Sequence, residues 1–235
     1  MKKIIIIPTY NEKKNIIILL DKIIKLYKSK FEILIIDDNS PDGTSREIIT
    51  YKKKKKFIKL KKRNKKLGIG SAHKYGIKYA IKKKFNILIT MDADGTHNPS
   101  YIQKFLYLIK NYDLITTNRF LNKKSLKEWP LSRIFLTNLR HYIIKFFLGM
   151  SIDSSGAFRC YNLKKIKLKD LLLAKDNGYS FFWESIYAIY KKGYSIKEIP
   201  IYLPYRTIGS SKMKFKDIFF ALKYLIYISI KNKKF

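Results

Sequence analysis

The segment Ile87-Leu88-Ile89-Thr90-Met91-Asp92-Ala93-Asp94-Gly95-Thr96-His97 runs from apolar residues into two aspartates that stand one residue apart. Its apolar part has the length of a buried strand. In an open α/β sheet, ligands bind beyond the carboxyl ends of the strands, so we expect both carboxylates at a binding edge. Asp92 and Asp94 share one side of an extended segment. Two hard oxygen ligands with room for water and phosphate suit Mg²⁺ or Mn²⁺. A solvated acidic turn is the alternative interpretation.

Short apolar runs alternate with helical patterns through the first half of the chain. The runs lack the apolar–polar alternation of half-exposed strands, so they predict a mostly parallel sheet covered by helices on both faces. The predicted strands are 4–7, 31–36, 57–60, 86–91 and 113–117, and the predicted helices are 15–26, 44–51, 71–83 and 99–111.

The second half predicts longer amphipathic helices. Helical spacing extends over 131–148, 181–190 and 215–230, and 195–203 has the composition of a strand. No repeat or Gly/Ser linker divides the chain. We therefore expect one α/β domain over 1–212, with an interface helix at 130–150 inside it. An amphipathic helix over 213–235 is expected to associate with a membrane.

The chain is strongly basic, with a formal net charge of +34 in 235 residues. Nucleic-acid binding, attraction to an anionic membrane surface and a lysine-rich coding bias all account for such a charge. The first apolar run is too short for a signal peptide, and no apolar stretch reaches the roughly 20 residues that cross a bilayer. A single cysteine excludes an internal disulfide and suits a reducing compartment. We expect a peripheral protein on the cytoplasmic face of a membrane.

Polar side chains follow four of the predicted strands. These segments are Pro8-Thr9-Tyr10-Asn11-Glu12, Asp37-Asp38, Asp92-Ala93-Asp94 and Asn118-Arg119. In a parallel sheet the four ends lie on one edge and can form one site, where acids hydrogen-bond a nucleoside and hold a metal on its diphosphate. Asp37-Asp38 is alternatively a helix-capping turn, and His97 is expected to pack or cap rather than to act as a base. Gly68-Ile69-Gly70 lacks the remainder of a Walker or dinucleotide motif, which argues against a GTPase, kinase or nicotinamide enzyme.

Several motifs in order resemble a known family. Ile-Pro-Thr-Tyr-Asn-Glu, Asp-Asp-Asn-Ser-Pro-Asp-Gly-Thr, Leu-Gly-Ile-Gly-Ser-Ala and Met-Asp-Ala-Asp look like the inverting nucleotide-sugar glycosyltransferases with the GT-A fold, a Rossmann-like type. The later motifs resemble dolichyl- or polyprenyl-phosphate mannosyltransferases: Trp129-x-x-x-Arg133, Ser155-Gly-Ala-Phe-Arg-Cys-Tyr161, Gly178-Tyr-Ser-Phe181, Glu198-Ile-Pro-Ile201 and Arg206-x-x-Gly-x-Ser-Lys212. The resemblance covers Ile4 to about Lys212.

The resemblance implies roles for individual residues. Those implied to hold the guanosine are Pro8, Tyr10, Glu12, Ile36 and Asp38. Those implied to meet the diphosphate and metal are Asp92, Ala93 and Asp94, with Thr96 a candidate further ligand. Phosphate charge would be met by Arg119, Arg206 and Lys212, and Arg133 would hold the lipid phosphate. Asp94, Arg119 and Arg133 are the catalytic candidates. Gly95 departs from the Leu that is common in the family.

The implied reaction is transfer of mannose from GDP-mannose to a polyprenyl phosphate with inversion. A lipid phosphate is already an anion, so it needs positioning cations rather than a strong base, and guanidinium groups grip phosphate bidentately. The same reaction with UDP-glucose or another UDP-sugar is a close alternative. The chain lacks the Gln-x-x-Arg-Trp signature of processive synthases.

Two other classes compete with an enzyme. A nucleic-acid-binding protein would focus its charge on one face, whereas here the charge is dispersed and an acidic cluster sits in the predicted site. We therefore expect no nucleic-acid partner. A non-catalytic membrane subunit would not need the strand-end acids and arginines. The need for a membrane-anchoring partner subunit is left open.

Overall fold

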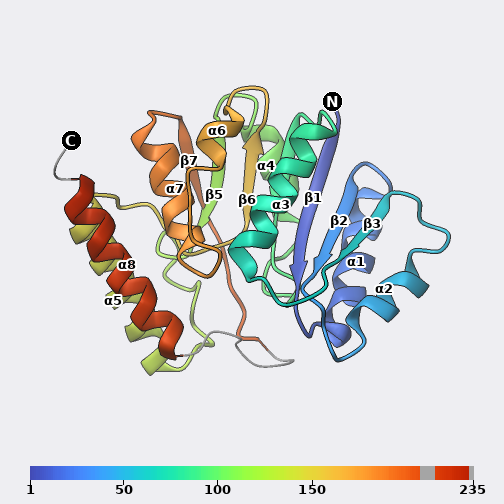
Figure 1. Ribbon diagram of the computed structural model, residues 1–235, viewed down its shortest axis with the longest axis horizontal. Helices are drawn as coiled ribbons and strands as arrows, with labels where there is room; N and C mark the ends of the chain where they lie inside the picture. The colour runs from blue at the N-terminus through green and yellow to red at the C-terminus, as the bar shows by residue number, and fades with distance from the viewer. Residues whose placement is uncertain (207–214, 233–235) are drawn as a thin grey trace.

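A seven-stranded sheet lies between two layers of helices in the computed structural model, which describes residues 1–206 and 215–232 (Figure 1). The strands are β1 Lys3–Thr9, β2 Glu32–Asp37, β3 Ile58–Lys62, β4 Ile87–Thr90, β5 Leu114–Asn118, β6 Arg159–Asn162 and β7 Ile196–Pro200. The helices are α1 Lys13–Tyr27, α2 Thr44–Tyr51, α3 Ile69–Lys82, α4 Tyr101–Leu108, α5 Leu131–Leu148, α6 Leu168–Leu171, α7 Phe181–Lys191 and α8 Phe215–Asn232.

The strand order is β3-β2-β1-β4-β6-β5-β7. Every neighbouring pair is parallel except those of β6, which runs antiparallel to both β4 and β5. Two reversals restore the direction, so β5 points the same way as β4. The carboxyl ends of β1, β2, β4 and β5 therefore share one edge, as the sequence predicted.

Each central strand contributes side chains to two separate hydrophobic cores, one on each face of the sheet. In β1, Ile4 and Ile6 face the cluster that also contains α3 and α7, whereas Ile5 and Ile7 face the cluster under α1 and α4. All four side chains are fully buried. A strand covered on both faces needs apolar residues at every position, which is why these runs show no alternation.

The sequence prediction failed at β6. The segment 152–161 was not assigned a strand, yet Arg159–Asn162 fills the gap between β4 and β5. Arg159 and Asn162 are polar residues that occupy buried strand positions, so hydrophobic periodicity gives no signal there. The single-turn helix α6 was also missed.

Helices α5 and α8 lie side by side at one end of the molecule (Figure 1). Helix α8 is joined to α7 through Tyr224, whose hydroxyl donates to Glu184 at 2.7 Å and whose ring lies 5.7 Å from that of Trp183. Their outer faces expose large apolar side chains. These are Leu131, Phe135, Leu136, Leu139, Tyr142 and Phe146 on α5, and Ile218, Phe219, Phe220, Leu222, Ile226, Tyr227 and Ile230 on α8. Within 1–206 and 215–232, no helix combines the length and the apolar character needed to cross a bilayer.

Gly68 and Gly70 begin α3 against the backbone of the 176–178 loop. A Cβ on Gly68 would lie 2.4 Å from the carbonyl oxygen of Asn177, and one on Gly70 would lie 2.8 Å from those of Asp176 and Gly178. Gly68 also has a φ of 93°. These glycines therefore allow close packing between α3 and the loop before α7, in agreement with the sequence argument against a phosphate loop.

We predict that Gly70→Ala lowers the free energy of unfolding by about 1–3 kcal/mol, because the new methyl group overlaps fixed backbone atoms. Urea denaturation measures the change. Lys78→Ala on the exposed side of α3 is the control and should stay within about 0.5 kcal/mol of the wild type. Equal stability of the Gly70→Ala protein would contradict the packing role.

Candidate active site

The four polar strand ends converge at the carboxyl edge of the sheet. Backbone hydrogen bonds join the ends of β1, β2 and β4, from Asp38 N to Thr9 O at 3.0 Å and from Met91 N to Ile6 O at 3.2 Å. Arg206 enters from the far end of the chain and pairs with Glu12. Its Nη1 atom also lies 3.7 Å from Asp94 Oδ2. Residues from the start, middle and end of the chain thus meet at one place.

Asp94 is held by its own turn. Its Oδ1 atom accepts hydrogen bonds from Thr96 Oγ1 at 2.7 Å and from Thr96 N at 3.1 Å. Gly95 makes this turn possible with a φ of 80°, a conformation that leucine rarely adopts. In this structure Thr96 therefore orients Asp94 by hydrogen bonding to Oδ1, and the other carboxylate oxygen, Oδ2, faces a cation.

His97 packs beneath the acidic pair. Its Nδ1 atom accepts a hydrogen bond from Asp92 N at 3.0 Å, and its ring stacks on Phe158 at 5.0 Å. Burial lowers the pKa of His97 to about 4. The imidazole is therefore neutral at physiological pH and supports the turn, which agrees with its predicted packing role.

The charges at this edge fit a divalent cation. Burial and the neighbouring carboxylates of Asp94 and Glu12 raise the pKa of Asp92 above its ordinary range. The described residues contain no set of three acidic, histidine or cysteine ligands. Mg²⁺ and similar ions often use one or two carboxylates and complete their shell with water and substrate phosphate. Asp92 and Asp94 meet that requirement.

The residues implied for the nucleoside differ in accessibility. Tyr10 and Pro8 are partly exposed at the end of β1, and the Lys66 ammonium lies 4.0 Å from the centre of the Tyr10 ring. Ile36 and Ala93 are buried, with 0% and 3% of their surface exposed. Side-chain contact with a ligand is thus open to Tyr10 and Pro8, whereas the side chains of Ile36 and Ala93 pack into the two cores on either face of the sheet.

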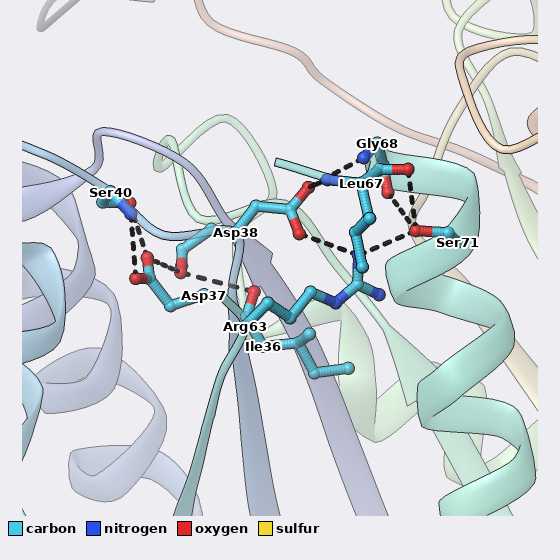
Figure 2. A network of polar contacts seen from close by, with 9 residues as sticks. Ile36, Asp37, Asp38, Ser40, Arg63, Leu67, Gly68 and Ser71 are labelled. Carbon is cyan, nitrogen blue, oxygen red and sulfur yellow. Dashed lines mark hydrogen bonds and ion pairs between the residues drawn. The ribbon is translucent and has the colours of Figure 1, made fainter. Parts of the chain in front are cut away.

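Asp38 lies in a polar network with Arg63 (Figure 2). Its Oδ1 atom accepts from Arg63 Nη1 at 2.7 Å, and its Oδ2 atom accepts from the amides of Leu67 and Gly68 at 3.1 and 2.9 Å. Both side chains are under 10% exposed. Asp38 therefore fixes the loop before α3, and a nucleoside would use only its remaining lone pairs. Arg63 was missed because it lies in a lysine-rich run.

The adjacent Asp37 has a structural role that does not involve Arg63. It is fully buried and accepts hydrogen bonds from Thr9, Ser40 and Ser45. It thus joins β1, β2 and the start of α2, but through the Ser45 hydroxyl rather than a backbone amide, so the helix-capping alternative is not confirmed for Asp37. The first amide of α2, that of Thr44, donates to Asp42 instead. Figure 2 shows the two neighbouring aspartates pointing into different networks.

Arg119 is oriented by an acid that the sequence analysis did not select. Asp153 Oδ2 accepts from Arg119 Nε at 2.7 Å and from Arg119 N at 3.1 Å. Glu198 on β7 accepts in turn from Asp153 N at 2.8 Å and from Asn118 Nδ2 at 2.9 Å. Although burial opposes the charge, the Arg119 contacts lower the pKa of Asp153 to about 2. The pairing uses Nε of Arg119 and leaves its terminal nitrogens for other anions.

Arg133 lies at the start of α5, over the ring of Trp129 at 4.1 Å. The Trp129 indole donates to Leu203 O at 3.0 Å, which ties the segment before α5 to the segment after β7. Arg140 lies farther along α5, and burial and the nearby charge of Arg119 lower its pKa to about 10. Arg119, Arg133 and Arg140 thus form a cationic zone between the sheet edge and α5. Lys212 lies outside the described residues.

Comparison with known proteins supplies the family. The model described as glycosyl transferase family 2 matches residues 4–172. The chain belongs to glycosyl transferase family 2. The predicted enzyme class, a glycosyltransferase, is thereby confirmed.

Two curated relatives match most of the chain. The polyprenol monophosphomannose synthase of Mycolicibacterium smegmatis is 28% identical over 222 residues, which are 92% of this chain and 83% of the relative. The undecaprenyl-phosphate mannosyltransferase of Micrococcus luteus is 28% identical over 214 residues, or 91% and 88%. The predicted resemblance to polyprenyl-phosphate mannosyltransferases is confirmed.

Solved structures share the fold of this family 2 domain. Mannosyl-3-phosphoglycerate synthase from Rubrobacter xylanophilus has a TM-score of 0.68 at 12% identity and covers 99% of this chain and 74% of its own. Glucosyl-3-phosphoglycerate synthase from Mycobacterium tuberculosis has a TM-score of 0.63 at 16% identity, with 97% and 78% covered. The predicted GT-A-type α/β fold is confirmed.

We predict that Asp153→Asn lowers the free energy of unfolding by about 2–4 kcal/mol at neutral pH, because the buried Arg119 loses its counter-charge. A carboxyl group with a depressed pKa stabilises the folded state above its unfolded pKa of about 4. The difference between wild type and variant should therefore shrink as the pH falls from 4 towards 2. Urea denaturation across this pH range measures it.

The control is Glu47→Gln, which removes an exposed pair with Lys13. It should change stability by less than about 1 kcal/mol. A pH-independent difference for Asp153→Asn would show that the ion pair is not its cause.

Proposed function

We propose that the protein transfers a mannosyl residue from GDP-mannose to a polyprenyl phosphate with inversion. The observation that carries this proposal is the juxtaposition of Asp92 and Asp94 with Arg119 at one sheet edge, beside the apolar face of α5 and α8. An acidic metal-binding pair, a zone of arginines and an exposed apolar surface are the three features that such a reaction needs. The two curated relatives named above act on polyprenol or undecaprenyl phosphate according to their names.

In the proposed reaction the residues divide the charges between donor and acceptor. Asp92 and Asp94 would hold Mg²⁺ or Mn²⁺, which would offset the negative charge that grows on the leaving diphosphate. The structural neighbour glucosyl-3-phosphoglycerate synthase was crystallised with Mn²⁺ and UDP and, in a second structure, with Mg²⁺ and UDP. Arg119 and Arg133 would hold the acceptor phosphate in position, so that one of its oxygens attacks the anomeric carbon from the face opposite the diphosphate.

The donor nucleoside is a separate part of the proposal. Tyr10, Pro8, Glu12 and Asp38 line the end of β1 and β2, where a base and ribose would bind. We assign GDP because the later motifs resemble those of dolichyl- or polyprenyl-phosphate mannosyltransferases. A UDP-sugar donor is the alternative, because the structures of glucosyl-3-phosphoglycerate synthase from Mycobacterium tuberculosis contain UDP.

We predict transfer of label from GDP-mannose into the organic-extractable fraction when purified protein, Mn²⁺ and polyprenyl phosphate are combined. UDP-glucose and UDP-GlcNAc serve as competing donors. Asp94→Asn should reduce the rate by a factor of about 100 or more, since it removes metal binding and electrostatic stabilisation. It should leave the circular dichroism spectrum unchanged.

Label from a UDP-sugar alone would replace the nucleoside and sugar assignment. Near-normal turnover of Asp94→Asn would remove the metal assignment. No transfer from any donor to polyprenyl phosphate would contradict the acceptor, or would require a membrane partner subunit.

We also propose that α5 and α8 lie on an anionic membrane surface. Phe146 and Phe219 are 84% and 65% exposed on neighbouring helices, and an interfacial helix buries such a face in the lipid. The positive charge of the chain adds attraction to anionic headgroups. This location would bring the lipid phosphate to the cationic zone beside α5.

We predict that the protein co-sediments with vesicles of phosphatidylcholine and phosphatidylglycerol. Phe146→Ser and Phe219→Ser should each weaken binding by about tenfold, because each removes the free energy gained by burying one aromatic side chain in the lipid. Tyr107→Ser is the control, because this side chain is 71% exposed on α4, away from the α5–α8 face. Equal losses for all three variants, or no binding by the wild type, would contradict the assignment.

A further inference from the structure

The guanidinium group of Arg206 spans two carboxylates at the sheet edge. One terminal nitrogen, Nη2, donates to Glu12 Oε1, and the other, Nη1, lies 3.7 Å from Asp94 Oδ2. The Arg206 side chain is only 13% exposed, and the side chains of Glu12 and Asp94 are 8% and 20% exposed. These partners come from the ends of different strands, so Arg206 crosses the centre of the proposed donor site.

Both carboxylates are held on the side away from Arg206. Glu12 Oε2 accepts from Asn15 Nδ2 at 2.7 Å, and Asp94 Oδ1 accepts from Thr96. The oxygens that face the site are therefore Glu12 Oε1 and Asp94 Oδ2. These are the atoms that Arg206 contacts, so the guanidinium lies where a cation bound to Asp94 would be close to it.

Resting on the proposed metal and donor site, we propose that Arg206 is the resident cation of the metal-free enzyme and competes with the divalent ion for Asp94. Glu12, Asp92 and Asp94 would repel one another without a positive charge between them, and Arg206 supplies one. A divalent ion bound at Asp94 would in turn be repelled by the guanidinium, so metal alone binds weakly.

The diphosphate of the donor resolves this competition. It offers Arg206 new anionic oxygens, to which a guanidinium binds strongly, and it supplies further ligands to the metal. Arg206 can then leave Asp94 without becoming unpaired. Metal and nucleotide consequently bind with positive cooperativity, and each strengthens the other by the same factor. Arg206 thus favours loading of the metal together with the nucleotide.

The test measures Mn²⁺ binding to the full chain without nucleotide, from the electron paramagnetic resonance signal of free Mn²⁺. Arg206→Gln should bind Mn²⁺ more tightly than the wild type, by about tenfold, within the usual range of coupling between two sites. Arg206→Lys keeps the charge and should remain close to the wild type. Lys22→Gln, on the exposed face of α1, removes one positive charge far from the site and should change nothing.

Calorimetric titration of GDP, with UDP in parallel, gives the second readout. The factor by which saturating Mn²⁺ tightens nucleotide binding should be larger in the wild type than in Arg206→Gln, although the variant binds nucleotide less tightly overall. Thermal melts establish that each variant is folded.

Unchanged or weaker Mn²⁺ binding by Arg206→Gln would overturn the inference, as would equal tightening by Lys22→Gln. Failure of the metal site itself has a different signature. If Mn²⁺ binds equally to the wild type and to Asp94→Asn, or to neither in the presence of either nucleotide, the proposed metal site is wrong.

Discussion

The structure depends on the accumulation of negative charge at one edge of a mostly parallel sheet. Glu12, Asp92 and Asp94 approach one another because β1 and β4 are neighbours and run in the same direction. Burial, and then repulsion from the carboxylates of Asp94 and Glu12, raises the pKa of Asp92. Such a cluster is tolerated only beside cations. Arg206 provides one within the chain, and a divalent ion would provide another.

The arginines around this acidic cluster are each held by a specific partner. Arg63 is paired with Asp38 and Arg119 with Asp153, so each arginine is oriented by a buried acid. Arg133 is instead held by aromatic contact with Trp129. A guanidinium that is held on one side presents its remaining donors in a fixed direction. This preorganisation suits the binding of two anionic substrates that would otherwise repel each other.

Much of this could be predicted from the sequence, for identifiable reasons. The continuous apolar runs of β1, β2 and β4 are typical of strands buried on both faces, and the polar residues that follow them predict the binding edge. The bounds of α2 and α5 were predicted correctly, because helical spacing is clear there. By contrast, β6 was not predicted, because it contains a buried arginine and an asparagine in place of a continuous apolar run. Partners that are distant in sequence, such as Asp153 for Arg119, Arg63 for Asp38 and Arg206 for Asp94, leave no local pattern to read.

The position of β6 also has a consequence for the order in which the chain can fold during synthesis. Strands β3, β2, β1 and β4 are complete once residue 90 has emerged, and they form an uninterrupted half-sheet. Strand β5 is made next, but its place is separated from β4 by a gap that only Arg159–Asn162 can fill. The nascent chain must therefore hold β5 without a partner on that side while more than forty further residues, α5 among them, are added. Exposed strand edges of this kind are sites of misfolding in larger proteins. An interior strand of the finished sheet, β6, is thus placed after five of the other six strands have been made.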